Sequence, residues 1–379
     1  MTLRVFEGFS GVGSQRMALR NLGVDFEVVG ISEVDKYALL AYDAIHNEQD
    51  KDFNYPDKEE MIAVMRKAHI GYNFSNGNDE IPRNINDIKK LYRAHINSHN
   101  FGDICLIDES SLPDFDLFTY SFPCKNISIA GKQAGLEEGS GTQSSLVWEC
   151  KRIIEAKKPT YLMMENVFNL VSDRHFPFFQ QWIKVVEDMG YVNKWMVMNS
   201  INHNSPQQRK RVIMISILKE HYNGYELPVG SMTNKRFVDI LETDVDSEFF
   251  VTNPNYQDYI RSIVLNSDTV RKDTVVRLGG LYDKNGVRRQ AGAIWDKYGL
   301  APTLDTCQGG YRQPLIVDKG GVRKITPKEA WRMMGYTDED FEKAKEIGKL
   351  SNSKLYERAG RGIVVPMLED IFRDLFCEE

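Results

Sequence analysis

Strand, turn and helix follow one another in the stretch Leu3-Arg4-Val5-Phe6-Glu7-Gly8-Phe9-Ser10-Gly11-Val12-Gly13-Ser14. Its apolar first half has the composition of a β-strand, and helix-forming residues follow from Ser14. Gly11 and Gly13 allow a tight turn between the two and let a ligand approach the amides at the helix start. Because many strand-to-helix turns contain glycine, the turn alone predicts a βα unit and no particular ligand.

The same alternation continues along the first half of the chain. Further strands are predicted at residues 26–32, 115–121 and 161–165 and near Val192 and Val212, with helices at residues 14–21, 36–47, 145–157 and 178–189. This order predicts an α/β fold with a doubly wound, mostly parallel sheet covered by helices on both faces. Ligands of such sheets bind at the carboxyl ends of the strands.

Two regions depart from the alternation. Residues 50–100 are rich in Lys, Asp and Asn with one predicted helix at 58–69, which indicates an insertion. Residues 221–315 contain short β-like pieces, Gly, Asn and scattered arginines, which indicates a smaller, mainly β second domain. The expected division is therefore a main domain at 1–220, the second domain at 221–315, and a return to the main domain at 316–379 with closing helix 364–376.

Composition limits the class of protein. The 379 residues carry a formal charge of −6 and contain no apolar run of membrane-spanning length, and the N-terminal sequence leaves no room for a signal peptide. The five cysteines are widely spaced, so we expect neither a disulfide framework nor a zinc site. This cysteine usage is typical of a reducing compartment, so we expect a cytoplasmic protein. Basic clusters at 207–211, 271–272, 288–289 and 323–324 still permit a local nucleic-acid-binding surface.

A cysteine follows the apolar strand 115–120, in Ser121-Phe122-Pro123-Cys124-Lys125-Asn126. Because proline ends the strand, the thiol is expected on a rigid strand exit, where nucleophiles are often placed. The alternative is an inert core cysteine.

Acidic and basic side chains lie at further predicted strand ends. Glu165 leaves an apolar strand, so its partly desolvated carboxyl can keep a proton near neutral pH; the alternative is a helix-capping role with Asn166. Glu33, and Asp87 with Ile88 at what is read as the next strand end, can accept hydrogen bonds from a nucleoside, or are ordinary surface carboxylates. Every second residue at the start of a further predicted strand is polar: Gln207, Arg209 and Arg211. At this spacing the three side chains share one face of the strand, where the two guanidiniums could converge on a phosphate or carbonyl. The alternative is a salt-bridged sheet edge.

Together these segments resemble the DNA (cytosine-5)-methyltransferase family over nearly the full chain. The resemblance rests on segments in family order: the turn at Phe9, the Pro-Cys loop followed by Gly131-Lys132-Gln133, Glu165-Asn166-Val167, and Gln207 to Arg211. Arg323-x-x-Thr326-Pro327-x-Glu329 with Met334-Gly335-Tyr336 and a final Ala359-Gly360 complete it.

The resemblance implies that Cys124 attacks C6 of a flipped cytosine, that Glu165 donates a proton at N3, and that C5 takes a methyl group from S-adenosylmethionine. Arg211 is then expected to hold the cytosine O2, with Arg209 ordering the loop or a phosphate. Residues 221–315 become a target-recognition domain that reads double-stranded DNA. The implied cofactor contacts are Phe9, Gly11, Gly13, Glu33, Asp87, Ile88 and Phe122, and the implied DNA contacts are Lys125, Ser128, Gln207 and Arg323.

Three positions depart from the family pattern. Lys125 stands where Gln is usual, Gln143 replaces a common arginine, and Arg361 replaces the asparagine of the closing Gly-Asn-Ser. A guanidinium near the sulfonium of the cofactor would be repelled by about 4 kcal/mol at ~4 Å. A DNA phosphate or a neighbouring carboxylate can offset it. Alternatively, Arg361 binds the carboxylate of carboxy-S-adenosylmethionine, and the product is 5-carboxymethylcytosine.

Readings from other classes remain. They are a DNA binder without catalysis, a tRNA cytosine-5 methyltransferase, and an unrelated Rossmann-type dehydrogenase. Intact Cys124, Glu165 and Arg211 argue against the first, and the last leaves Cys124, Glu165 and the paired arginines unexplained. The expected enzyme is a bacterial or phage modification enzyme, such as those of restriction-modification systems, that acts as a monomer.

Overall fold

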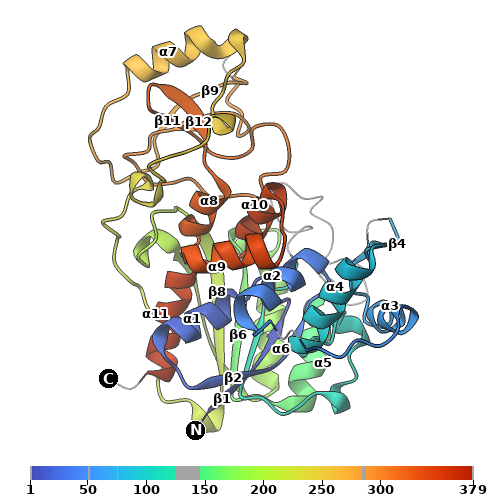
Figure 1. The fold of residues 1–379 in the computed structure, drawn as a ribbon. Helices are drawn as coiled ribbons and strands as arrows, with labels where there is room; N and C mark the ends of the chain where they lie inside the picture. The colour runs from blue at the N-terminus through green and yellow to red at the C-terminus, as the bar shows by residue number, and fades with distance from the viewer. Residues whose placement is uncertain (1, 50–51, 75, 124–145, 284–286, 378–379) are drawn as a thin grey trace. The chain divides into compact units, whose positions relative to one another are not determined.

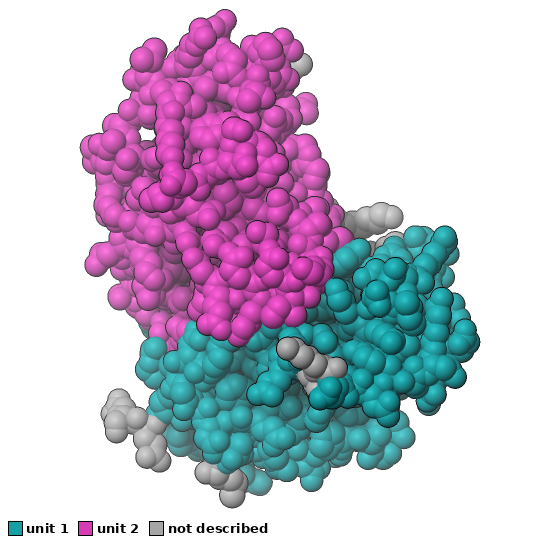
Figure 2. Space-filling model, in the orientation of Figure 1, with its two compact units in different colours: residues 1–198, 210–229, 371–379 teal, residues 199–209, 230–370 magenta. Residues whose placement is uncertain are grey.

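The computed structural model describes residues 2–49, 52–74, 76–123, 146–283 and 287–377. Contacts divide the chain into two compact units, coloured separately in Figure 2. Unit 1 comprises residues 1–198, 210–229 and 371–379, and unit 2 comprises residues 199–209 and 230–370. Residues 316–370 cluster with the smaller sheet, and the expected division at 220 and 315 stays a prediction.

Unit 1 is built on a six-stranded sheet, some of whose strands are labelled in Figure 1, and the order of its strands is β2-β1-β5-β6-β8-β7. β1 pairs in parallel with β2 and β5, and β5 with β6, whereas β8 runs antiparallel to β6. The prediction of a mostly parallel, doubly wound sheet is confirmed. The strands are β1 (Leu3–Gly8), β2 (Phe26–Ser32), β5 (Leu117–Tyr120), β6 (Tyr161–Val167), β7 (Tyr191–Asn199) and β8 (Lys210–Leu218).

Helices connect these strands, as expected. A large apolar cluster joins the sheet to two of them, α5 and α6, through buried residues such as Phe118, Trp182 and Met214. Burying such side chains contributes roughly 1.5–3 kcal/mol each. The helices are α1 (Ser14–Leu22), α2 (Lys36–His46), α5 (Val147–Lys157), α6 (Phe176–Asp188) and the closing α11 (Val365–Phe376).

The insertion is a folded part of unit 1. It contains two helices, α3 (Lys58–Lys67) and α4 (Ile85–Asn97), and a small hairpin of β3 (Tyr72–Asn73) and β4 (Asn78–Asp79). Met61, Met65 and Leu91 from the two helices pack with Leu39 and Tyr42 of α2 in a second apolar cluster. Only the first of these helices was predicted.

Unit 2 contains a four-stranded sheet with the order β12-β11-β10-β9. Its strands are β9 (Arg277–Gly280), β10 (Ala293–Trp295), β11 (Leu315–Asp318) and β12 (Gly321–Lys324). Its helices are α7 (Gln257–Leu265), α8 (Pro327–Met333), α9 (Asp338–Glu342) and α10 (Asn352–Arg361). In the described part of the chain, no helix has the length and apolar character needed to cross a membrane.

Candidate active site

The glycine turn and Glu33 meet at the carboxyl edge of the main sheet. Because β1 and β2 are parallel neighbours, the residues that follow them lie side by side. The Gly11 amide donates to the Glu33 carboxylate at 2.9 Å, and the amides of Val34 and Asp35 donate to the same carboxylate at 2.9 and 2.7 Å. Two of the predicted cofactor residues are therefore in contact.

The two glycines of the turn do different work. Both have positive φ, 58° at Gly11 and 79° at Gly13. A Cβ at Gly11 would meet no atom within 4 Å, whereas a Cβ at Gly13 would lie 2.3 Å from Nε2 of His46. Gly11 therefore leaves its backbone open to a ligand, and Gly13 permits close packing of the turn on α2.

This difference predicts separate effects for two matched substitutions. Gly13→Ala should lower the free energy of unfolding by more than the roughly 1–2 kcal/mol of left-handed backbone strain, because His46 must also move. Gly11→Ala should cost only the backbone strain but weaken binding of the cofactor, since the methyl group fills the open space. Urea unfolding and calorimetric titration with S-adenosylmethionine measure the two effects. Equal stability losses in both variants would contradict the assignment.

A buried polar network supports the turn from below. Glu7 of β1 is fully buried and accepts a 2.6 Å hydrogen bond from the Tyr42 hydroxyl and a 3.2 Å hydrogen bond from the Arg16 amide. Burial raises the pKa of Glu7. The Arg16 side chain donates to the His46 carbonyl at 3.2 Å, which joins α1 to α2. The sequence does not indicate this role for Glu7, because a charged residue in a strand usually faces solvent.

Asp87 and Ile88 do not lie at a strand end. Asp87 is an exposed residue in the first turn of α4, and Ile88 is buried in the apolar cluster of the insertion. The predicted placement was wrong, because the short polar stretch before them continues into a helix. The expectation that Asp87 contacts the cofactor depended on that placement, so the structure gives no geometric support for it.

Residues 100–103 take the strand-end position instead. Ile31 and Asn100 form a parallel bridge, and the Asn100 side chain pairs with the backbone of Glu33 at 3.0 and 2.9 Å. Asp103 follows and contacts Nδ1 of His69 at 2.8 Å. Asn100 and Asp103 were missed; the Gly102-Asp103 pair after an apolar Phe101 was the available sign of a strand-to-loop transition.

Glu165 and Arg211 form an ion pair within unit 1. Arg211 faces Val167 in the antiparallel register of β6 and β8, so Glu165, two residues earlier, is its diagonal neighbour on the same face. Nε of Arg211 lies 2.9 Å from Oε1 of Glu165, with side-chain exposures of only 13% and 11%. The structure thus brings together a predicted proton donor and a predicted base-binding guanidinium.

Cys124, Lys125, Ser128 and Gln143 lie outside the described residues. The strand exit that leads to them is anchored by Asn166, whose side-chain amide donates to the Phe122 carbonyl at 3.2 Å. The Phe122 ring is only 3% exposed and packs in the main apolar cluster, so it serves the core of unit 1. Asn166 is an anchoring residue to which the sequence pointed only as a helix cap.

Three of the described cysteines are poor candidates for a nucleophile. Desolvation, with Asp103 nearby, raises the pKa of the Cys105 thiol to about 12, and burial raises the pKa of Cys150 and of Cys307. A thiol must ionise to attack. No group of His, Cys, Asp and Glu among the described residues could hold a metal ion.

Gln207 and Arg209 are structural residues of unit 2. Gln207 is fully buried, donates to the Met333 carbonyl at 3.2 Å and accepts from the Leu304 amide at 2.9 Å. No part of its side chain faces solvent in the structure, and the predicted DNA contact stays a prediction. Arg209 is 2% exposed and donates to the carbonyls of Leu304, Gly360 and Gly362 at 2.8–3.0 Å, as expected of a residue that orders a loop.

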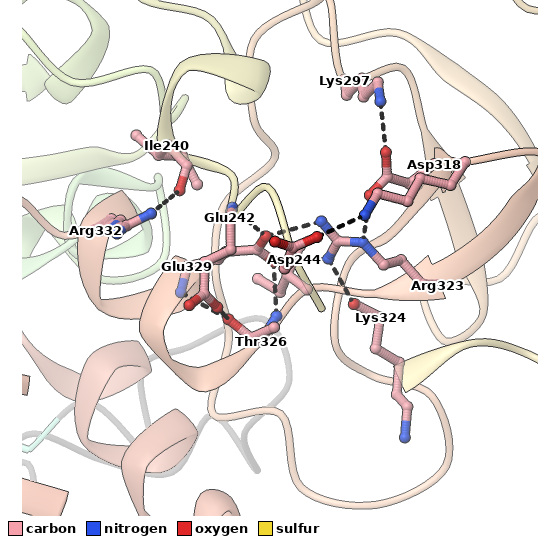
Figure 3. A network of polar contacts seen from close by, with 12 residues as sticks. Ile240, Glu242, Asp244, Lys297, Asp318, Arg323, Lys324, Thr326, Glu329 and Arg332 are labelled. Carbon is pink, nitrogen blue, oxygen red and sulfur yellow. Dashed lines mark hydrogen bonds and ion pairs between the residues drawn. The ribbon is translucent and has the colours of Figure 1, made fainter. Parts of the chain in front are cut away.

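Arg323 does not reach the surface either. Figure 3 shows its guanidinium between Asp318 and Glu329. Two parallel hydrogen bonds of 2.8 Å join it to Glu329, a third of 2.7 Å joins it to Asp318, and Arg323 and Glu329 are both 0% exposed. The guanidinium therefore pairs with the buried Glu329 and the largely buried Asp318, and its predicted DNA contact stays a prediction.

Arg361 is paired with a carboxylate of its own helix, α10. It forms an ion pair with Glu357, which also accepts from Arg358 at 2.9 Å and Lys354 at 2.8 Å. Although burial acts in the opposite direction, these cations lower the pKa of Glu357. Of the explanations offered for Arg361, a neighbouring carboxylate that offsets its charge is thus present.

Comparison with known proteins gives consistent matches over the chain. A family model described as C-5 cytosine-specific DNA methylase matches residues 65–377. The type II methyltransferase M2.ScrFI of Lactococcus lactis subsp. cremoris is 39% identical over 381 residues, covering 99% of each chain. The orphan methyltransferase M.SssI of Spiroplasma monobiae is 32% identical over 382 residues, covering 97% of this chain and 96% of the relative.

Solved structures show the same fold. The S. pombe Dnmt2 methyltransferase matches with a TM-score of 0.62 at 15% identity, over 99% of this chain and 98% of that one. The Entamoeba histolytica methyltransferase EhMeth matches with a TM-score of 0.59 at 13% identity, with the same coverage.

Proposed function

Because this chain belongs to the C-5 cytosine-specific DNA methylase family, we propose that it transfers a methyl group from S-adenosylmethionine to C5 of a flipped cytosine in double-stranded DNA. The observation that carries the proposal is the ion pair between Glu165 and Arg211. It supplies a carboxyl for N3 and a guanidinium for O2, two adjacent atoms on one edge of cytosine, from two neighbouring strands.

Each residue has a defined task in the proposed reaction. The Cys124 thiolate bonds to C6 while Glu165, acting in its protonated form, gives its proton to N3, which turns C5 into an enamine carbon. C5 would take the methyl group that the cofactor supplies, with S-adenosylhomocysteine as the leaving group. A base then removes the C5 proton, the C6–sulfur bond breaks to restore the thiolate, and N3 returns its proton to Glu165. Arg211 holds O2 and the carboxyl orientation throughout. Asn166 fixes the Phe122 carbonyl and hence the start of the segment that carries Cys124.

The residues present fit S-adenosylmethionine. Gly11 leaves open space beside its backbone, Glu33 lies in contact with it, and among the described residues the buried Ser10 hydroxyl has no hydrogen-bond partner. The adenosine would lie against Glu33 and the Phe9 to Gly13 turn. When bound, the cofactor supplies a methyl group made electrophilic by its sulfonium.

The function is tested by nucleoside mass spectrometry of unmethylated duplex DNA incubated with enzyme and S-adenosylmethionine. The expected product is 5-methyldeoxycytidine, and a duplex containing 5-fluorocytosine should trap a covalent complex that survives denaturing electrophoresis. A parallel reaction with tRNA separates the RNA alternative. DNA binding without product would instead support a non-catalytic binder.

The same mass-spectrometric assay tests the role of Arg361. Because Glu357 already offsets its charge, we expect wild-type enzyme to use S-adenosylmethionine and to gain no preference for carboxy-S-adenosylmethionine. Arg361→Asn, which restores the family residue, should change the ratio of methyl to carboxymethyl product by less than about twofold, since a lost bidentate carboxylate contact would cost far more. A strong wild-type yield of 5-carboxymethyldeoxycytidine that Arg361→Asn abolishes would favour the carboxymethyl alternative.

A further inference from the structure

Most arginines of unit 2 are already used inside the protein. Arg236, Arg261, Arg271, Arg277, Arg323, Arg332, Arg358 and Arg361 pair with carboxylates of this unit, and Arg209 is bound by carbonyls. The exposed Arg312 guanidinium has neither kind of partner among the described residues. Only Arg288 and Arg289 share this property, and they adjoin residues 284–286, which are not described.

Arg312 belongs to a loop that is held at both ends. At the start, Leu304 accepts from Arg209 at 2.8 Å and donates to Gln207 at 2.9 Å. At the end, the Ile325 amide donates to the Pro314 carbonyl at 3.1 Å. The loop is therefore tied to the segment of unit 2 that carries Gln207 and Arg209.

The residue next to Arg312 is also held firmly. The Tyr311 carbonyl accepts from the Gly292 amide at 2.7 Å, its ring packs on Tyr282 at 6.1 Å, and Lys324 lies over the ring at 5.8 Å. Tyr311 has φ of 51°, a left-handed conformation that a bulky residue adopts only when its surroundings require it. This arrangement fixes the direction in which the chain presents Arg312.

The tip of the loop is open. Gly309 and Gly310 are exposed with φ of 77° and 49°, and a Cβ at either would meet no atom within 4 Å. Gln308, also exposed, has no hydrogen bond among the described residues. A tip without side chains lets the backbone approach another molecule closely, with an amide on one side and a guanidinium on the other.

We propose that the loop of residues 305–313 enters the major groove of the substrate DNA and that Arg312 reads a guanine of the target sequence. The inference rests on the proposed function and extends it to a specificity-determining residue. A guanidinium can donate two hydrogen bonds to O6 and N7 of guanine, a pair that no other base offers. Such a contact requires a guanidinium that is not already paired, on a chain segment whose backbone is anchored; Arg312 is exposed and follows the anchored Tyr311.

The test compares the sites methylated by wild-type enzyme, Arg312→Gln and Arg312→Lys in plasmid DNA from a host without cytosine methylation, read at single-base resolution. Arg312→Gln should relax one position of the wild-type motif from guanine to several bases, lowering discrimination there about 5- to 150-fold. Arg312→Lys should keep part of the preference. Arg261→Gln removes an exposed arginine of α7 and should leave the motif unchanged.

Three results would count against a role in sequence reading. An unchanged motif in Arg312→Gln overturns the inference, and so does a loss of activity that is equal at all sequences, which indicates a phosphate contact. A wild-type motif without a guanine also overturns it. Wild-type enzyme that leaves all cytosines unmodified overturns the proposed function itself. Activity of Arg312→Gln at its relaxed sites shows that this variant folds.

Discussion

Exchange of Cys124 for serine is expected to reduce 5-methyldeoxycytidine formation to background and to abolish the covalent complex with 5-fluorocytosine DNA. Serine has almost the same size, but its hydroxyl is far less nucleophilic than a thiolate near neutral pH. DNA and cofactor binding should persist in this variant. Single-turnover methylation followed by mass spectrometry measures the first effect, and denaturing electrophoresis measures the second.

The matched control is Cys105→Ser, which should keep full activity because the raised pKa of Cys105 makes it a poor thiolate. A second variant, Glu165→Gln, should slow methylation about 10²- to 10⁴-fold, since the amide cannot give up a proton as an acid does. Methyl transfer at the wild-type rate by Cys124→Ser would rule out the covalent mechanism.

The largest effect on stability is expected for Glu329→Ala in unit 2. Glu329 accepts two hydrogen bonds from Arg323 at 2.8 Å and further bonds from the amides of Thr326 at 2.7 Å and Glu242 at 2.8 Å. Removing one partner of a buried ion pair leaves the other charge uncompensated and costs about 3–5 kcal/mol. Urea unfolding of the full chain should show this loss.

Two comparisons sharpen that result. Glu329→Gln keeps the acceptor oxygen for one amide and should lose less stability than the alanine variant. Glu339→Ala removes an exposed carboxylate paired with Lys343 on the surface of unit 2 and should cost about 0–1 kcal/mol. If Glu329→Ala unfolds no more easily than Glu339→Ala, the buried network does not stabilise the unit as described. Since Arg323 is buried, the salt dependence of DNA binding should be the same in the Glu329→Gln variant as in the wild-type enzyme.

Local pattern was a good guide to the main sheet. β2 and the start of α2 lie where the alternation predicted them, because strand and helix periods, glycine turns and a capping Asp35 act over a few residues. α4 was missed because its polar, Asn-rich start reads as loop, although Asn84 caps it and Leu91 supplies its buried face. This misreading also placed Asp87 at a strand end, whereas it lies in the first turn of α4.

The kinds of residue needed for cytosine chemistry could be identified from the chain, but their partners could not. Arg209, Arg211 and Arg323 look alike in the sequence. Register places Arg211 beside Glu165, burial gives Arg209 three carbonyls, and two carboxylates enclose Arg323. The sequence likewise permits Arg361 as a ligand for a cofactor carboxylate, whereas in the structure Glu357, one helical turn earlier, pairs with it.

The sequence by itself determined the α/β alternation, the glycine turn, and the order of segments typical of cytosine-5 transfer, because each depends on neighbours in the chain. Only the tertiary structure decided which polar side chains are already satisfied. Burial and pairing depend on residues that are far apart in sequence, and a charged group with internal partners is no longer available to DNA or cofactor. By that criterion Gln207 and Arg323 are structural residues of unit 2, and Arg312 becomes the arginine to test.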